Sequence, residues 1–392
     1  LIKNKIYRLT HEAYYVQKLK SYREGRKQWK EIFHIKDMHL PGQVRLESMD
    51  CFLTKMQRCL VSYALNKQRV FIAEVDIKKR ELIADGFHLN INGDNRIRWV
   101  DEDNVLVAAP YLTSTSSTAD GNSREVRLWR RGEELKKTKI LIQGKQTDIG
   151  FFHWVMHSKE GQVNYISYWY ADGTGQLYFF KDGNLKKVLH PTNMTSFHSY
   201  YQGSILIQLF EDWREFKKND VVKIKLETSV PELIYRPESD LGINDIHTTH
   251  SRIFMSYTQR AQKKVAELYK NKNGQWIKKI IPFSKNTSLS ISSANYFNNT
   301  VLYQEESFIQ APRLILREKN KSQIVQKAPA FFDKDKFETI QLYAESKDGQ
   351  MIPFFLTKAK ELKLNKTHPT LLYGYGAFGQ SLTPTYRPEI GK

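Results

Sequence analysis

The sequence predicts a mainly β protein, a seven-bladed β-propeller followed by the first strands of a truncated α/β domain. Three observations lead to this prediction. Short β-rich segments recur along most of the chain, the composition favours strands, and the pattern changes near residue 333. Tyr and Phe number 21 each, against 7 Trp, and aromatic residues make up 12% of the 392 residues. Aromatic residues of this kind suit half-buried strands.

The recurring segments share a strand that ends in Leu and an aromatic residue, followed by a charged turn. They read REVRLWRRG around Leu128, GQLYFFKDG around Leu177 and AELYKNKNG around Leu268, with a looser copy, PRLILREKN, around Leu314. The intervals between these anchors are about 49, 91 and 46 residues. The middle interval therefore predicts one further copy between Leu177 and Leu268.

Three more copies complete the series. DVVKIKLET around Val222 fills the long interval, and VFIAEVDIKKREL around Val75 and YYVQKLKSY near Leu19 extend it toward the N-terminus. Other short strands lie between the anchors, so each unit of about 40–50 residues has about four strands, as in a propeller blade. The alternative is a pair of β-sandwiches with a coincidental period. No helical period breaks the pattern before residue 330, which favours the propeller.

The character of the chain changes after Gln326–Phe337. The segment ETIQLYAESKDGQMIPFFLTKAKEL predicts a β-hairpin around a Lys-Asp-Gly turn. The mostly apolar run PTLLYGYG, residues 369–376, then predicts a buried strand. We therefore expect a propeller over residues 1–332 and the beginning of an α/β domain over residues 333–392.

The charge of the chain does not by itself predict a polyanion site. The net charge is +19 and the pI is about 9.6. Lys and Arg are interleaved with acidic residues, and no block of five or more basic residues occurs. This pattern favours a solvated basic surface over nucleic-acid binding. No run approaches the roughly 18 apolar residues of a membrane span.

Cysteine and histidine spacing predicts no metal centre and no cofactor. Cys51 and Cys59 form no Cys-x-x-Cys motif, so we expect neither a zinc site nor a disulfide, and reducing, cytoplasmic surroundings. His247 and His250 in HTTH have no third ligand nearby and predict a surface turn. The adjacent carboxylates Glu305–Glu306 should face opposite ways on a strand, which makes them a poor acid/base pair.

The end of the buried run carries the strongest candidate site. Gly374 and Gly376 permit a chain reversal with positive φ, and strands that end in such turns position site residues in α/β folds. Tyr373 and Tyr375 flank Gly374, so one of them can project a phenol into a cleft. A preorganised phenol can donate a hydrogen bond to an oxyanion. On spacing alone, packing of both tyrosines at a strand end is the favoured alternative.

The segment LLYGYGAFGQSLTPTY resembles the signature that opens the catalytic domain of the prolyl oligopeptidase family of serine peptidases. ESKDGQMIPFFL and HPTLLYGYG precede it in the expected order. The resemblance is strongest over residues 337–388, and SLTPTY is closer to the prolyl branch than to the branch that cleaves after Arg or Lys. It implies a seven-bladed propeller on an α/β-hydrolase domain, Tyr375 as the oxyanion-hole phenol and Phe378 beside the proline pocket. Ala377 stands where the family usually has Gly.

The resemblance also implies a catalytic serine in a Gly-x-Ser-x-Gly elbow, followed by Asp and His. GNSRE at Gly121 and GQSLT at Gly379 lack the second glycine, and no other elbow occurs. We therefore expect the triad to lie in a C-terminal catalytic segment missing from this chain, and the family's N-terminal helical segment to be absent as well. The chain alone is then expected to be inactive.

The function implied for the complete protein is that of a serine endopeptidase that cleaves short peptides after proline, with the propeller gating access. It is expected to be a monomer without nucleic-acid or membrane partners. The alternative is a non-catalytic propeller from a split or decayed gene that binds acidic partners through its basic surface. The presence of YGYGAFG argues against this alternative, because a binding module does not need a turn that supplies a hydrogen-bond donor to an oxyanion.

Overall fold

The computed structural model of the chain describes residues 6–12, 15–23, 28–40, 44–52, 57–65, 69–91, 93–158, 161–191, 196–318, 321–377 and 380–389. Over these residues the protein forms strands β1 to β30 and three short 3₁₀-helices, η2 (Ile35–Met38), η3 (Leu135–Lys137) and η4 (Lys334–Lys336), with no α-helix. The mainly β fold class predicted from the sequence is confirmed. The chain divides into an N-terminal unit, Ile2–Lys218 with Val222–Glu232, and a C-terminal unit, Asn219–Val221 with Leu233–Lys392.

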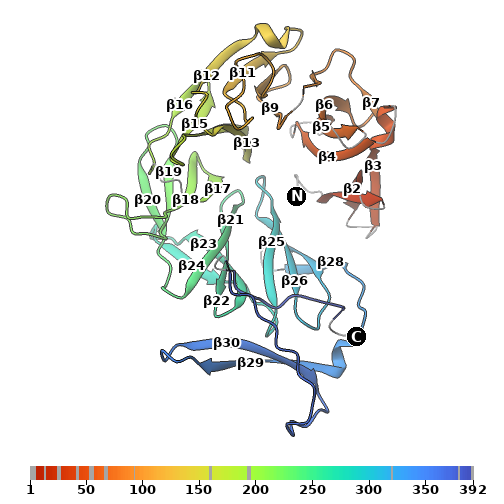
Figure 1. The fold of residues 1–392 in the computed structure, drawn as a ribbon, viewed down its shortest axis with the longest axis vertical. Helices are drawn as coiled ribbons and strands as arrows, with labels where there is room; N and C mark the ends of the chain where they lie inside the picture. Colours follow the sequence, from red (N-terminus) through yellow and green to blue (C-terminus); the bar gives the residue numbers. More distant parts are fainter. Residues whose placement is uncertain are drawn as a thin grey trace. The chain divides into compact units, whose positions relative to one another are not determined.

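The N-terminal unit is a series of antiparallel sheets, each built from strands that follow one another in the chain (Figure 1). The first two sheets contain β1 (Ile6–Glu12), β2 (Tyr15–Arg23) and β3 (Gln28–His34), then β4 (Val44–Cys51), β5 (Arg58–Leu65), β6 (Arg69–Asp76), β7 (Glu81–Leu82) and β8 (His88–Leu89). Two four-stranded sheets follow, with β9 (Arg96–Trp99), β10 (Asn104–Ala108), β11 (Glu125–Arg130) and β12 (Lys139–Gln143), then β13 (Gly150–Ser158), β14 (Gly161–Trp169), β15 (Gly175–Lys181) and β16 (Asn184–Lys187). The next sheet, which reaches the division between the units, contains β17 (Ser196–Tyr201), β18 (Ser204–Gln208), β19 (Val221–Lys225) and β20 (Pro231–Tyr235).

The sheets of the N-terminal unit pack face to face through alternating side chains. On β10, Val105 and Val107 belong to a core shared with the β4–β8 sheet, which supplies Leu60, Ile72 and others. Leu106, between those two valines, belongs to a second core shared with β13 and β14. Alternate residues of a strand point to opposite faces, so both faces of this sheet are buried. Burial of both faces and sequential strand order are features of propeller blades.

The C-terminal unit contains two more sheets of the same kind. They are β21 (Leu241–Thr248), β22 (Ile253–Gln259), β23 (Gln262–Lys270) and β24 (Trp276–Ile280), then β25 (Ser288–Ala294), β26 (Thr300–Glu306), β27 (Arg313–Glu318) and β28 (Lys321–Lys327). A core that includes Phe254, Leu289 and Tyr303 lies between them. His247 lies on β21, with its Nε2 atom 2.8 Å from the Asp245 carboxylate, so the predicted surface turn is wrong for this residue.

The repeat anchors occupy equivalent strands. Leu128, Leu177 and Val222 lie on β11, β15 and β19, each the third strand of its sheet. Leu268 and Leu314 occupy the same place on β23 and β27, as Val75 does on β6. Leu19 differs, since β2 is the middle strand of the three that its sheet shows. The repeated segments in the sequence therefore correspond to the third strand of successive sheets.

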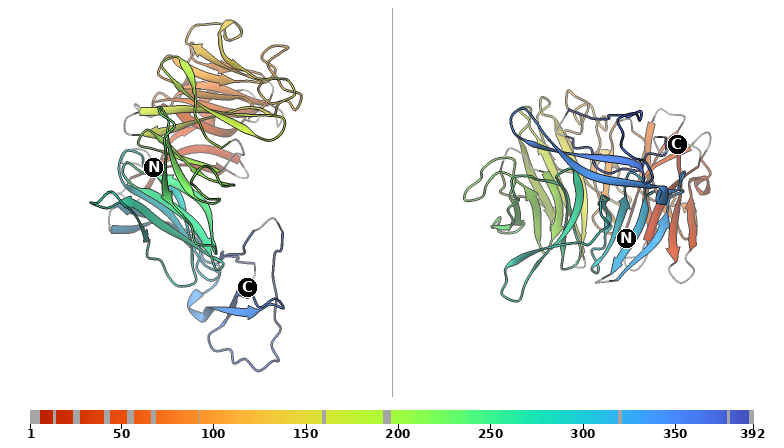
Figure 2. Two further views of the ribbon diagram at one scale, coloured as in Figure 1. Left: turned by 90° about the vertical axis from the view of Figure 1, so that its left-hand side faces the viewer. Right: turned by 90° about the horizontal axis from the view of Figure 1, so that it is seen from below.

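The predicted hairpin is confirmed as β29 (Phe337–Glu345) and β30 (Met351–Ala359), joined by a turn in which Gly349 has a φ of 81°. The hairpin forms a two-stranded sheet of its own and runs across the end of the two larger sheets of its unit (Figure 2). On one face, the Gln341 amide donates to the Arg260 carbonyl at 2.7 Å, and the Phe355 ring lies 5.3 Å from the Phe308 ring. These contacts fix which face of the hairpin is turned toward the sheets.

The two cysteines form a disulfide, so the expectation that they would not pair is wrong. Cys51 on β4 and Cys59 on β5 lie directly opposite each other in the antiparallel register and are joined through their sulfur atoms. The sequence spacing was read as separation along one strand-rich stretch, whereas neighbouring antiparallel strands bring such residues together. The inference of reducing surroundings loses its support. In the part of the chain that the structure describes, no helix has the length and apolar character needed to cross a membrane.

Candidate functional site

The run that was predicted to be a buried strand is neither a strand nor buried. Residues 370–376 have no strand assignment, and the side chains of Leu371 and Leu372 are 74% and 94% exposed. The nearby hairpin pairs only β29 with β30, so within the described residues no neighbouring strand bonds to the run or covers its apolar side chains. A strand without such neighbours gains little from its apolar residues.

The glycines of the run do not form the predicted left-handed turn. Neither Gly374 nor Gly376 has a positive φ, and a Cβ atom added to either would meet no atom within 4 Å. The expectation of positive φ is therefore wrong, and in this structure the glycines lie in open surroundings. Their remaining effect is to leave the backbone on both sides of Tyr375 with more conformational freedom than other residues would allow.

The two tyrosines of the run differ in their contacts. The Arg387 guanidinium lies 4.7 Å from the centre of the Tyr373 ring. A hydrogen bond to Tyr373 also raises the pKa of Arg387 above its usual value. Tyr375 is 47% exposed, and its side chain forms no hydrogen bond or ring contact with any described residue. Tyr373 is thus held by the protein, while the Tyr375 phenol is free for a ligand.

The segment that follows the run is anchored to the C-terminal unit. The Tyr386 amide donates to the Glu306 carboxylate at the end of β26, at 2.9 Å, and the Tyr386 hydroxyl accepts from the Phe331 amide at 2.8 Å. The Tyr386 ring also stacks on the Phe332 ring, with centroids 5.2 Å apart. These contacts give the backbone next to Arg387 a defined position beside the β25–β28 sheet.

The adjacent carboxylates at the end of β26 have separate partners. Glu306 accepts from Tyr386, whereas Glu305 is 3% exposed and forms a 2.6 Å ion pair with Arg313. Of the residues expected at the site, Phe378 lies outside the described residues, and Tyr375 lies exposed on the run of residues 370–376. Sequence reasoning did not identify Tyr386 and Arg387, and it treated Glu306 only as half of a poor acid/base pair. Glu306 and Tyr386 are 80 residues apart, so no local spacing could reveal their contact.

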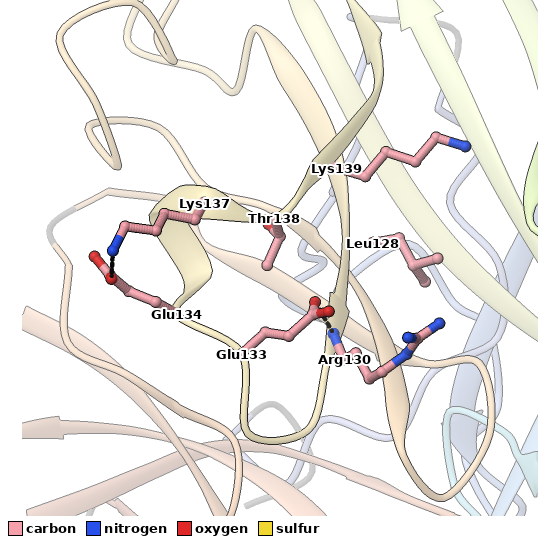
Figure 3. Close-up of a pocket in the computed structure, with 7 residues that line it drawn as sticks. All are labelled: Leu128, Arg130, Glu133, Glu134, Lys137, Thr138 and Lys139. Carbon is pink, nitrogen blue, oxygen red and sulfur yellow. Dashed lines mark hydrogen bonds and ion pairs between the residues drawn. The ribbon is translucent and has the colours of Figure 1, made fainter.

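A shallow cavity of about 400 Å³ lies at the edge of the β9–β12 sheet, beside η3 (Figure 3). Its lining is Leu128, Arg130, Glu133, Glu134, Lys137, Thr138 and Lys139. Two of these side chains, Lys137 and Glu134, form a 2.6 Å ion pair at the surface. The cavity contains no nucleophile next to a base, and we assign it no chemistry.

Two titratable groups with shifted pKa values lie on the first strands of two sheets in the N-terminal unit. His153 on β13 is 0% exposed, and burial lowers its pKa to about 3. The Asn164 amide donates to the Trp99 carbonyl at 2.8 Å, which turns its oxygen toward His153 Nε2, 2.9 Å away. His153 is therefore neutral, with its proton on Nε2. Burial likewise raises the pKa of Asp50 on β4 to about 6, partly offset by the Arg98 charge.

No protein-family profile matches the sequence. The chain is 26% identical to an uncharacterized peptidase, y4nA, of Sinorhizobium fredii, over 95% of this chain and 54% of the relative. A prolyl endopeptidase of Elizabethkingia meningoseptica is 28% identical over 36% of this chain and 20% of its own length. The chain thus spans about half the length of the first of these relatives and a smaller part of the second.

Solved structures have the same fold. A post-proline cleaving enzyme from Rickettsia typhi superposes with a TM-score of 0.82 at 21% identity, covering 99% of this chain and 61% of that one. Oligopeptidase B from Trypanosoma brucei superposes with a TM-score of 0.75 at 12% identity, over all of this chain and 56% of that one. The curated relatives and the structural neighbours are peptidases of one family.

Proposed function

Because the chain belongs to the prolyl oligopeptidase family of peptidases, we propose that it is the N-terminal part of a serine endopeptidase that cleaves short peptides after proline. The support is the YGYG run with its SLTPTY continuation, together with relatives about twice as long as this chain. The catalytic Ser, Asp and His would be supplied by polypeptide that the relatives carry beyond the matched region. The monomeric state and cytoplasmic location expected from the sequence stay predictions.

We further propose that residues 1–332 close into a seven-bladed propeller that admits only short, unfolded peptides, and that residues 333–392 begin the α/β-hydrolase domain. Strands β1 to β28 fall into seven sheets in chain order, and the repeat anchors lie on equivalent strands in six of them. Both observations support the count of seven. A closed ring of blades would leave only a narrow passage for substrate.

In the proposed reaction, the serine oxygen attacks the carbonyl carbon of the proline residue while a histidine takes its proton. The carbonyl oxygen becomes an oxyanion, to which the Tyr375 phenol donates a hydrogen bond. Collapse of this intermediate releases the amine, which receives the proton from histidine, and water then hydrolyses the acyl-enzyme in the same way. The observation that carries this role is the free, exposed phenol of Tyr375 next to a tyrosine that is already engaged.

The test is Tyr375→Phe in the full-length enzyme, assayed with a short peptide that contains proline. Loss of one oxyanion donor costs about 10²–10³ in kcat, and we expect a loss of that size with a small change in KM. Tyr343→Phe is the matched control, because it removes a similarly exposed phenol outside the motif. An unchanged kcat in Tyr375→Phe would remove Tyr375 from the oxyanion hole. Replacing proline by alanine in the peptide tests the proposed specificity.

A further inference from the structure

We propose that Arg387 is a positioning residue that holds Tyr373 and thereby sets the direction in which Tyr375 presents its phenol. The proposal rests on the function proposed for Tyr375. It goes beyond that function because Arg387 itself touches neither substrate nor oxyanion. Its basis is a continuous set of contacts from the β25–β28 sheet to the tyrosine run.

The first part of this set fixes the backbone beside Arg387. Tyr386, its neighbour in the chain, is bonded through its amide to Glu306 and through its hydroxyl to the Phe331 amide, and it stacks on Phe332. Three independent contacts from one residue leave little freedom to the backbone that follows. The Arg387 side chain therefore starts from a defined point on the C-terminal unit.

The second part connects that point to the run. The Arg387 guanidinium lies 4.7 Å from the centre of the Tyr373 ring, within the range of a cation–π contact. No other hydrogen bond, ion pair or ring contact holds the side chain of Tyr373 or Tyr375 in the described residues. Between the two tyrosines, Gly374 has open space around it. With Tyr373 released, nothing in this part of the chain would define the direction of Tyr375.

Position matters here because an oxyanion donor acts only when its hydrogen atom already points at the developing charge. A displacement of about 1 Å in a catalytic group can lower the rate by about 10²-fold. Arginine suits the task because its planar guanidinium can stack on a ring while it donates hydrogen bonds, whereas a lysine ammonium keeps only the charge. The proposal therefore predicts that lysine is an incomplete substitute.

The experiment uses four variants of the full-length enzyme, namely Arg387→Ala, Arg387→Lys, Tyr375→Phe and the double variant Arg387→Ala/Tyr375→Phe. We expect Arg387→Ala to lower kcat by about 10- to 100-fold, with KM nearly unchanged, and Arg387→Lys to lie between Arg387→Ala and the wild type. In the Tyr375→Phe background, Arg387→Ala should cause no further loss, because no phenol remains to be positioned. Arg214→Ala is the matched control, since its guanidinium also lies 4.7 Å from an aromatic ring, that of Trp213.

Each other outcome has a distinct meaning. Equal losses from Arg387→Ala in both backgrounds would show a general structural role and overturn the proposal. An unchanged kcat in Arg387→Ala beside a large loss in Tyr375→Phe would overturn the role of Arg387 and leave the function of Tyr375 intact. A silent Tyr375→Phe would overturn both.

Discussion

Arg131 holds the buried carboxylate of Glu74 through both of its terminal nitrogens, at 2.8 Å and 3.1 Å. Glu74 lies on β6 and is 0% exposed, whereas Arg131 follows β11 in the next sheet. The same guanidinium bonds to Asp103 at 3.1 Å and lies 4.6 Å from the centre of the Phe87 ring. The Arg131 side chain therefore links two neighbouring sheets of the N-terminal unit by binding the Glu74 carboxylate, which is buried from water.

We predict that Arg131→Met destabilises the protein strongly. Removing Arg131 leaves the buried Glu74 charge with only Arg58, 3.8 Å away, and the Phe87 amide as partners, and breaking a buried ion pair costs about 3–5 kcal/mol. Urea unfolding followed by tryptophan fluorescence should show a lower midpoint. Lys137→Met, which removes the exposed ion pair to Glu134, serves as the control and should leave the midpoint nearly unchanged. Similar midpoints for Arg131→Met and wild type would mean that the pair does not join the sheets.

The disulfide should stabilise the β4–β5 pair. Closing the short loop between Cys51 and Cys59 lowers the entropy of the unfolded chain, and for a loop of about nine residues this effect amounts to about 2–3 kcal/mol. Cys51→Ser/Cys59→Ser should therefore unfold at a lower urea concentration than the oxidised wild type. Reduced wild type should behave like the double variant. Alkylation of both cysteines without prior reduction would show that the bond does not form.

The buried carboxyl of Asp50 should make stability depend on pH. Its pKa of about 6 in the folded protein lies above the value of 3.8 expected for the unfolded chain. Between these values the folded state holds the proton that the unfolded state has lost, so the contribution of Asp50 to stability falls as pH rises. Asp50→Asn removes this effect. We expect the variant to exceed the wild type in stability by roughly 3 kcal/mol above pH 6 and by little below pH 4.

His153 acts in the opposite direction over much of the same range. Its pKa of about 3 in the folded protein lies below 6.5, so the unfolded state takes up a proton first and stability falls as pH decreases from about 6.5 to about 3. Comparing Asp50→Asn with wild type at each pH cancels this contribution, because His153 is present in both proteins. A constant stability difference between the two proteins from pH 4 to pH 7 would contradict the assignment for Asp50.

The outer face of the hairpin should make this chain prone to association. Ile340 lies opposite Leu356 and Leu342 opposite Phe354, on the face turned away from Gln341 and Phe355. Ile340, Leu342 and Phe354 are each more than a third exposed. Because exposed apolar strands pair with other chains, Leu342→Thr/Phe354→Thr should reduce the light scattering of the 392-residue chain. Thr339→Ser/Thr357→Ser is a control at another cross-strand pair, and equal scattering in all three proteins would contradict the prediction.

The fold was predictable from the sequence where local patterns carry the information. The Leu-aromatic strand followed by a charged turn is local, and it marked the third strand around Leu128 and Leu177, where β11 and β15 both begin with three buried residues. The hairpin was predictable for the same reason, since its turn residues and alternation lie within one short segment. The seven-fold count and the domain boundary stay predictions.

The candidate site was only partly predictable, because its contacts are not local. Tyr375 was identified through a motif, but the contacts of Arg387 with Tyr373 and of Tyr386 with Glu306 join residues that no spacing rule connects. The buried strand expected at Leu371 and Leu372 failed because a strand needs neighbours, and the described residues supply none. The Cys51–Cys59 pair could not be predicted from sequence spacing, because the antiparallel register of β4 and β5 brings the two residues together.

The equivalent position of the anchors has a consequence for how such a chain can change length during evolution. Leu128 and Leu177 both lie on the third strand of a four-stranded sheet. A genetic recombination that joined the gene at these two codons would fuse the first half of β11 to the second half of β15. The product would lose one sheet, yet the fused sheet would still contain four strands in the right order. Duplication between the same codons would add one complete sheet, so blade number can change in single steps without leaving a broken sheet.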